Sequence, residues 1–254
     1  MKLAVQTRPW GVERNRTDLN GVLTEVAAAG YDGFEIGNQH LDLSRPHALR
    51  AMAEAHGLAI AGIHAGGEIS DPAAVEKARA DIIRIAGFIV DVGASILPFS
   101  GMPKENKSPA ELQMEADNLN RIGELCAARD VQLCYHNHYW EIQNDCAELQ
   151  FLCDHTDPAL VNLCLDLGWV QRAGGDPLGV AQRFAERIAY VHIKDTTADE
   201  WRELGMGDVT WLNLLQFLEE LHLPWGTVEQ DEVSRPAGES ATISRTFLRD
   251  MMGW

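Results

Sequence analysis

The chain has 254 residues and a formal net charge of −17, from 38 acidic and 21 basic residues. An acidic chain without a basic cluster repels phosphate backbones, and no apolar run reaches the length that spans a bilayer, so we expect neither nucleic acid nor a membrane as a partner. The first residues lack the apolar core and the cleavage site of a signal peptide, so we expect a cytoplasmic location.

Eight short apolar segments rich in β-branched residues recur along the chain and predict strands. They start at Leu3, Gly33, Leu58, Ser95, Val131, Val161, Ile188 and Gly226. Successive starts are about 25–38 residues apart, which is roughly the length of one strand and one helix with their loops. The segments SILPF and VNLCLDL are apolar at nearly every position, as expected for parallel strands covered on both faces.

Stretches with helical periodicity lie between these strands. In residues 17–30, Thr17 or Asp18 is a candidate N-cap and Gly30 a stop signal. Ser108 precedes a proline and is followed three residues later by Glu111, which is a capping-box pattern. Residues 208–223 have the same form and predict a further helix.

Eight strand–helix units without a linker or a change of composition predict an α/β fold, a (β/α)8 TIM barrel that forms a single domain over residues 1–254. A doubly wound open sheet is the alternative. The first strand–helix turn, TRPWGVERN, lacks a glycine-rich phosphate loop, which disfavours that alternative.

The cysteines do not indicate a disulfide framework or a zinc ribbon. They are odd in number and form no CxxC pair: Cys126, Cys134, Cys146, Cys153 and Cys164. We expect buried free thiols in a reducing compartment.

Polar residues that can bind metal or transfer protons stand at the ends of most predicted strands. They are Gln6, Arg8, Glu35, His64, His136, His138, Glu141, Asp166, His192, Lys194, Asp195, Glu229, Gln230 and Asp231. The carboxyl ends of barrel strands meet at one mouth, where TIM barrels hold their active sites. A mixed set of carboxylates and imidazoles without a thiolate suits a divalent ion such as Mn²⁺, Co²⁺, Zn²⁺ or Mg²⁺.

Three of the carboxylates at these strand ends are interpreted as supporting groups. Glu35 is expected to be a partner of Arg8 at one end of the barrel. Asp195 and Asp231 are expected to support neighbouring groups or to cap loops.

Five segments carry a resemblance to a known family. They are YHNHYWE from Tyr135, LDLGWVQRAGGDP, VHIKD, LGMGDVTW and VEQDE. In this order they resemble the xylose isomerase-like TIM barrels, and within them the sugar phosphate isomerase/epimerase and inosose dehydratase-like branch. The resemblance spans nearly the whole chain.

The resemblance implies one divalent ion, with Mn²⁺ favoured over Co²⁺, Mg²⁺ or Zn²⁺, on a Glu, Asp, His, Glu set from strands five to eight. Asp166, His192 and Glu229 match three members of that set. Many relatives have a glutamate where this chain has His136. The fourth ligand is therefore either His136 or Glu141, and we favour Glu141 because it restores the number of carboxylates.

The resemblance also implies that Glu229 serves as ligand and as catalytic base. His138 follows His136 by two positions and should point to the same side of the strand, so we expect it to be the acid. Lys194 follows His192 by two positions and is expected to hold an oxyanion or hydroxyl. The candidates for substrate contact are His64, His136, Trp10 and Trp169.

The residues at the strand ends, together with the resemblance, imply a divalent-metal-dependent sugar isomerase or epimerase that abstracts a proton next to a carbonyl through a metal-bound enediolate. The alternative is a lyase or dehydratase that acts on a keto-sugar, an inosose or a 3-keto-glycoside by the same enolisation followed by β-elimination. A non-catalytic sugar-binding barrel is less favoured. A phosphodiesterase of the endonuclease type is disfavoured by the acidic charge. The expected binding partner is a small-molecule substrate, a sugar or keto-sugar. The sequence does not decide whether the chain forms a homo-oligomer.

Overall fold

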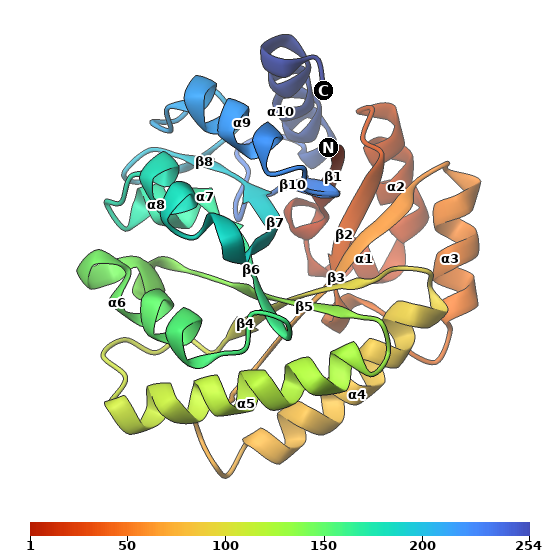
Figure 1. Cartoon of the computed structure of the whole chain (residues 1–254). Coiled ribbons are helices and arrows are strands. Elements are labelled where there is room, and N and C mark those ends of the chain that lie inside the picture. The colour runs from red at the N-terminus through yellow and green to blue at the C-terminus, as the bar shows by residue number, and fades with distance from the viewer.

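A computed structural model describes residues 1–254 and confirms the predicted TIM barrel. Eight parallel strands close in the order β1-β10-β7-β6-β5-β4-β3-β2 (Figure 1). Their bounds are β1 Lys2–Gln6, β2 Gly33–Gly37, β3 Ala59–Gly67, β4 Ile96–Gly101, β5 Gln132–His136, β6 Val161–Asp166, β7 Ile188–Ile193 and β10 Trp225–Val228. Each predicted strand therefore forms within two residues of its expected start.

Ten α-helices surround the barrel, because the connections after β1 and β6 each hold two (Figure 1). They are α1 Val12–Thr17, α2 Leu19–Ala28, α3 Pro46–Ala55, α4 Val75–Asp91, α5 Pro109–Ala127, α6 Tyr139–His155, α7 Leu167–Arg172, α8 Pro177–Arg183, α9 Trp211–Glu220 and α10 Ala237–Met252. Short 3₁₀ turns lie at Arg8–Trp10, Asn38–His40 and Ala185–Arg187.

The helix start signals are confirmed at two places and wrong at a third. Asp18 accepts the backbone N–H of Gly21 at the start of α2, and Ser108 forms the capping box that begins α5. The helix expected from Asp208 begins only at Trp211. The backbone N–H of Asp208 donates to the carbonyl of Thr196, so Asp208 belongs to the preceding loop.

Apolar side chains pack on both sides of the strands. The larger core lies between strands and helices, and a smaller one consists of Ala4, Ala61, Ile96, Cys134, Cys164 and Tyr190. Successive side chains of a strand point to opposite faces. Cys134, Cys164 and Tyr190 therefore share a face with the polar residue two positions later on each strand. The small core fills the barrel beneath those polar groups.

A two-stranded antiparallel hairpin follows β7 and was not predicted. It consists of β8 (Asp195–Thr196) and β9 (Trp201–Arg202). Its strands are too short to produce a hydrophobic pattern in the sequence. The hairpin matters because it places Trp201 beside the carboxyl ends of β6 and β7.

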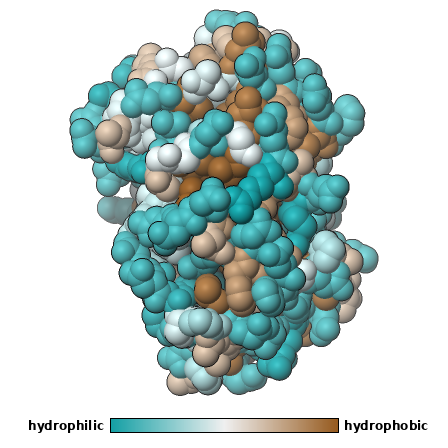
Figure 2. Space-filling view, turned by 60° about the vertical axis from the view of Figure 1, so that its left-hand side comes forward, coloured by the Kyte–Doolittle hydropathy of each residue, from teal (hydrophilic) through white to brown (hydrophobic).

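The surface agrees with the composition. The face drawn in Figure 2 is mostly hydrophilic, with smaller hydrophobic areas between the polar residues. No helix combines the length and the apolar character needed to cross a bilayer. All five cysteines are free, and all but Cys153 are buried, which confirms the expectation for the thiols.

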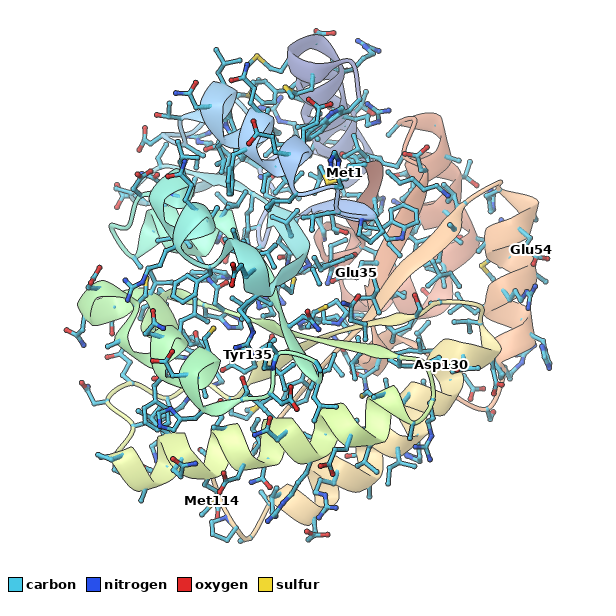
Figure 3. The ribbon with its side chains drawn as sticks, in the orientation of Figure 1. Met1, Glu35, Glu54, Met114, Asp130 and Tyr135 are labelled. Carbon is cyan, nitrogen blue, oxygen red and sulfur yellow. The ribbon has the colours of Figure 1, made fainter.

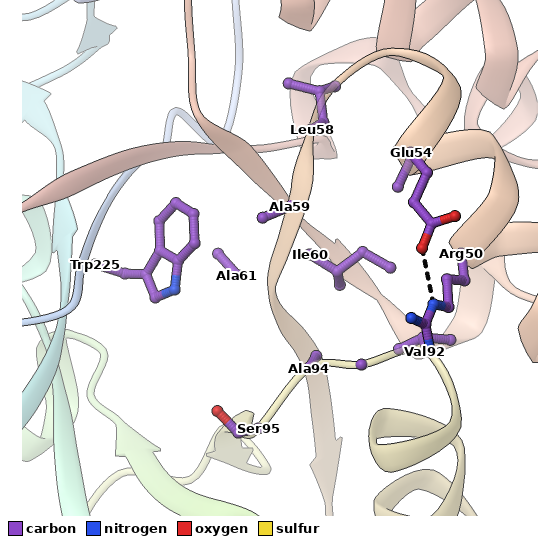
Figure 4. A pocket seen from close by; sticks show the side chains of 12 residues that line it. Arg50, Glu54, Leu58, Ala59, Ile60, Ala61, Val92, Ala94, Ser95 and Trp225 are labelled. Atoms are coloured by element: carbon purple, nitrogen blue, oxygen red, sulfur yellow. Dashed lines mark hydrogen bonds and ion pairs between the residues drawn. The ribbon is translucent and has the colours of Figure 1, made fainter.

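A pocket of about 260 Å³ opens at the amino ends of the strands (Figure 4). Ala59 and Ile60 at the start of β3 line it, together with Trp225 at the start of β10 and an Arg50–Glu54 ion pair. No imidazole lines this pocket and its one carboxylate, Glu54, is paired, so the chemistry has to be sought at the opposite end of the barrel.

Candidate metal centre

Four side chains converge at the carboxyl ends of four neighbouring strands. This ligand cluster consists of His136 on β5, Asp166 on β6, His192 on β7 and Glu229 directly after β10. One ligand atom from each lies within 4.8 Å of all the others. Each of these residues continues the face of its strand that points into the barrel, because side chains two positions apart lie on the same face. The closed barrel therefore turns all four side chains inward.

The distances within the ligand cluster are those of atoms that can share one ion. His136 Nε2 lies 3.3 Å from Asp166 Oδ2, and His192 Nδ1 lies 2.8 Å from Glu229 Oε2 and 3.8 Å from Asp166 Oδ2. Ligands at about 2.0–2.2 Å from a common ion are roughly 3–4 Å apart. The Nδ1 atom of His192 is buried, and its contact with Glu229 does not have the angles of a hydrogen bond. The donor set and the direction of this nitrogen fit a divalent metal.

Asp166 is held from two directions. Its Oδ1 accepts the backbone N–H of Trp169 at the start of α7 at 2.8 Å, which leaves Oδ2 for the cluster. Asn137 accepts the backbone N–H of Asp166 at 2.9 Å through its side-chain oxygen. The carboxylate is therefore both a helix cap and a member of the ligand cluster, and its position is set before any ligand arrives.

The two imidazoles of the cluster have different partners at their other nitrogen. His192 Nε2 lies 3.0 Å from Glu35 Oε2, and both side chains are buried. His136 Nδ1 lies 3.2 Å from the hydroxyl of Ser100, which also lies 3.0 Å from His64 Nε2. The expectation that Glu35 pairs with Arg8 is therefore wrong: Arg8 pairs with Asp231 at 3.1 Å.

Lys194 lies beside the cluster, and its side chain is fully buried. Its Nζ is 3.3 Å from both Asp166 Oδ2 and Glu229 Oε2, and it also contacts Asp231. Burial by itself would lower the pKa of Lys194, but these three carboxylates raise it above its usual value. Lys194 is thus a permanent ammonium group at the site.

The carboxylates are held ionised in turn. Burial by itself would raise the pKa of Glu229, but Lys194 and His192 hold it well below its usual range. The same balance lowers the pKa of Asp166, where burial is opposed first by Lys194. Both groups are therefore acceptors and can bind a cation without first losing a proton.

His138 lies just beyond β5, at the N-cap of α6, and its ring centroid is 4.8 Å from that of His136. It stacks on Trp140 at 4.5 Å and approaches Trp169 at 5.5 Å. Burial first, and then the neighbouring His136, lower the pKa of His138 to about 2. Its Nδ1 is buried without a hydrogen-bond partner, as is Nε1 of Trp140.

Aromatic rings cover the cluster on the side of β6 and β7. Trp169 at the start of α7 meets Trp201 of the hairpin edge-on at 4.7 Å. The Lys194 ammonium lies 4.3 Å from the centre of the Trp201 ring, and the Arg172 guanidinium lies 4.2 Å from it. Two cations therefore hold the Trp201 ring in place beside Lys194.

The structure places His136, and not Glu141, in the ligand cluster. Glu141 is fully buried in the first turn of α6, where its carboxylate accepts the backbone N–H of His138 and the hydroxyl of Tyr135. Tyr135 lies between β5 and the surrounding helices (Figure 3), on the opposite face of the strand from His136. Glu141 therefore belongs to a polar network outside the barrel.

The predicted substrate contacts divide into two groups. His64 and Trp169 lie near the cluster, with His64 in edge contact with His136 at 5.5 Å. Trp10 lies outside: it is buried in the turn after β1, where its Nε1 donates to Glu25 at 2.7 Å. Trp10 is therefore a packing residue, contrary to the expectation.

Asp195 has the loop-capping role that was expected. Its two oxygens accept four backbone N–H groups and the indole N–H of Trp211, all within residues 196–211. A Cβ at Gly207 would lie 2.2 Å from Asp195 Oδ1, so only glycine fits there. This arrangement fixes the loop that carries Trp201.

Three site residues were missed or misread in the sequence: Glu35, Ser100 and Asn137. Glu35 lies in the middle of β2 and Ser100 near the end of β4, both in otherwise apolar strands, and Asn137 lies between the two histidines of HNH. A polar residue within or directly after an apolar strand was the available signal. Their partners, however, lie on other strands and could not be inferred from local sequence.

Comparison with known proteins gives concordant results. The family model described as xylose isomerase-like TIM barrel matches residues 23–251. A protein named inosose dehydratase from Bacillus cereus is 27% identical, over 91% of this chain and 78% of its own length. A crystal structure of a sugar phosphate isomerase/epimerase from Parabacteroides distasonis superposes with a TM-score of 0.83 at 20% identity, covering 98% of this chain and 93% of the other.

A second solved structure has the same fold. It is that of a probable 3-DHS dehydratase from Bacillus anthracis, with a TM-score of 0.82 at 16% identity and 98% of each chain covered. Both structural matches concern the fold.

Proposed function

The chain belongs to the xylose isomerase-like TIM barrel family, and we propose that it is a metal-dependent enzyme that removes a proton from a carbon next to a carbonyl group of a sugar or keto-sugar. The observation that carries this proposal is the buried ligand cluster at the mouth of the barrel, with four ligand atoms within 4.8 Å of one another. Isomerisation or epimerisation is the leading outcome of this step.

The ligand cluster offers two imidazoles and two carboxylates. This mixture suits Mn²⁺, Co²⁺ and Zn²⁺ better than Mg²⁺, which prefers oxygen ligands and retains several waters. We favour Mn²⁺. When bound, the ion would polarise the substrate carbonyl and make the neighbouring C–H more acidic.

Glu229 is the proposed base. It lies at the mouth, remains 7% exposed, and is the least buried member of the ligand cluster. Because Lys194 and His192 keep it ionised, its carboxylate is ready to accept the proton from carbon.

Lys194 is the proposed stabiliser of negative charge. Its ammonium lies 3.3 Å from the base Glu229 and is fully buried, so it meets any oxygen that gains charge beside that residue. A fixed positive charge in a water-poor site stabilises an enediolate more than it would in water. The raised pKa keeps Lys194 in the charged form that this role requires.

His138 is the proposed proton carrier. Since burial lowers its pKa to about 2, it begins the reaction neutral and must accept a proton before it can donate one. Its unpartnered Nδ1 supports acceptance from a substrate hydroxyl. His138 can then return that proton to carbon or oxygen on the other side of the substrate, while Glu229 gives the proton that it took from carbon to the oxygen that lost one.

A dehydratase or lyase is the second candidate, favoured by the curated relative named inosose dehydratase that matches most of this chain. The first proton transfer would be the same. The enediolate would then expel a β-substituent, with His138 passing its proton to the departing oxygen. The position of the substituent in the bound substrate decides between the two outcomes.

The test combines metal content with proton exchange. Inductively coupled plasma mass spectrometry on dialysed protein should find about one equivalent of divalent metal in the parent and in the exposed control Glu186→Gln, and little in Asp166→Ala. NMR in D₂O should then show deuterium entering a keto-sugar next to its carbonyl, and Glu229→Gln should abolish this.

The products separate the two candidates. A product of unchanged mass supports isomerisation or epimerisation, whereas loss of a substituent with an enone absorbance supports the lyase. Absence of metal from the parent, even after reloading with Mn²⁺ or Co²⁺, would refute the metal-dependent enzyme.

A further inference from the structure

Glu35 and His192 form a hydrogen bond across the interior of the barrel. Glu35 lies on β2 and His192 on β7, and β1 and β10 stand between these strands in the sheet. Glu35 Oε2 is 3.0 Å from His192 Nε2, and the side chains are 0% and 1% exposed, respectively. Figure 3 shows Glu35 toward the middle of the strands. The contact is therefore made inside the barrel, shielded from water.

Glu35 does not form an ion pair with any arginine or lysine, so ordinary ion pairing does not explain its burial. Arg8, the partner expected from the sequence, is instead paired with Asp231. The second oxygen of Glu35, Oε1, is buried without any hydrogen-bond partner. A buried carboxylate costs free energy unless it is compensated, and here His192 is its sole hydrogen-bond partner.

The consequence for His192 is geometric. Because Glu35 faces Nε2, that nitrogen carries the hydrogen that is donated, and Nδ1 is turned toward Glu229 and Asp166. We propose that Glu35 is a positioning residue that holds a proton on His192 Nε2 and fixes the ring so that Nδ1 is presented to the ligand cluster. This inference rests on the proposed metal site for its effect on affinity.

The other imidazole of the cluster provides an internal comparison. His136 Nδ1 meets the neutral hydroxyl of Ser100, which in turn meets His64. A carboxylate orients a ligand imidazole more firmly than a hydroxyl and makes it a stronger electron donor. Loss of Glu35 should therefore weaken metal binding more than loss of Ser100.

The first measurement is ¹⁵N NMR of the histidine rings in the parent protein, metal-free and loaded with Zn²⁺. The His192 signals are assigned by their absence from His192→Gln. We expect a slowly exchanging proton on His192 Nε2 in both samples. In Glu35→Gln the signal of this proton should be shifted, and the proton should exchange faster. A parent protein with His192 Nε2 unprotonated would overturn the inference, and this result needs no variant to fold.

The second measurement is the dissociation constant for Mn²⁺ by calorimetry. Glu35→Gln should raise it by roughly 10–100-fold, as is typical for the partner of a ligating histidine. Ser100→Ala should raise it less, and Glu141→Gln, a buried carboxylate outside the cluster, should leave it unchanged. An unchanged constant in Glu35→Gln, with tight binding by the parent, would refute the positioning role and leave the proposed function standing. If the parent binds no metal but retains the protected Nε2 proton, the proposed function fails while the Glu35 contact is upheld.

Discussion

His136 Nε2 lies 3.3 Å from Asp166 Oδ2, across two paired strands of the barrel. This contact puts an imidazole where the family resemblance led us to expect a carboxylate. It follows that the candidate ligand on strand five belongs to the strand itself, whereas Glu141, in the first turn of the following helix, turns away from the mouth.

Replacement of His136 should therefore affect metal binding, and replacement of Glu141 should not. For His136→Ala we expect the Mn²⁺ dissociation constant to rise by more than the roughly 10–100-fold that follows loss of a ligand's hydrogen-bond partner. Glu141→Gln retains an acceptor for His138 and should bind as the parent does. Calorimetric titration of the two proteins decides this, and the reverse order of affinities would restore Glu141 as the ligand.

Lys194→Met should destabilise the metal-free protein by about 3–5 kcal/mol, because it leaves buried carboxylates without their cation. Mn²⁺ should reduce this difference from the parent, since an ion on Asp166 and Glu229 supplies the missing charge. Urea unfolding with and without Mn²⁺ measures the effect.

The matched control is Lys107→Met. Lys107 is also buried, but it pairs with Glu115 and Glu148 between the barrel and the helices, away from the ligand cluster. Its loss should also destabilise the protein. Mn²⁺ should not change the resulting difference in the free energy of unfolding between this variant and the parent. Equal rescue of both variants would contradict a specific charge exchange at Lys194.

Asp195→Ala should loosen the loop after β7, because five N–H donors lose their acceptor. We expect a loss of about 2–4 kcal/mol in the free energy of unfolding, as for other broken buried networks. Hydrogen exchange should rise across residues 196–211 and stay unchanged in α4, on the far side of the barrel. Uniform exchange across the chain would show instead that Asp195 stabilises the whole fold without a local role.

Two glutamates at the same position of a helix should respond oppositely to pH. Glu141 in α6 and Glu111 in α5 each accept the backbone N–H of the residue before the helix. Burial raises the pKa of Glu141 to about 7, whereas Lys104 and Ser108 lower that of exposed Glu111 to about 2.

The sign of each effect follows from proton binding. Between pH 4.5 and 7 the folded protein holds more protons at Glu141 than the unfolded chain, so the stability that this group contributes falls as pH rises, by up to about 3 kcal/mol. For Glu111 the unfolded chain holds more protons between pH 2 and 4.5, so its contribution is present above that range and is lost as pH falls through it.

Urea unfolding at pH 5 and pH 8 tests this. Relative to the parent, Glu141→Gln should gain stability at the higher pH, because an amide does not have to ionise in a buried site. Glu111→Gln should show the same difference from the parent at both values. A Glu141→Gln variant that behaves like Glu111→Gln would mean that Glu141 is ionised in the fold across this range.

The barrel and the strands that bear the site could be predicted from the sequence, because hydrophobic periodicity and helix signals are local. Asp166, His192 and Glu229 could be proposed because each stands at or near the end of an apolar strand and matches the ligand set that the family resemblance implies. Trp10 was misplaced because an aromatic residue just after a strand does not reveal whether it turns toward the mouth or, as here, toward Glu25 in a helix.

The sequence by itself therefore determined the order of strands and helices, the face on which polar residues gather, and the kinds of ligand on offer. Only the tertiary structure decided that His136 enters the cluster while Glu141 joins Tyr135, and that Glu35 meets His192 and not Arg8. The physical reason is the closure of the barrel. Closure brings Glu35 and His192 together, although they are 157 positions apart in the sequence. Each buried polar group then has to find its hydrogen-bond partner among the side chains that share the same water-poor interior.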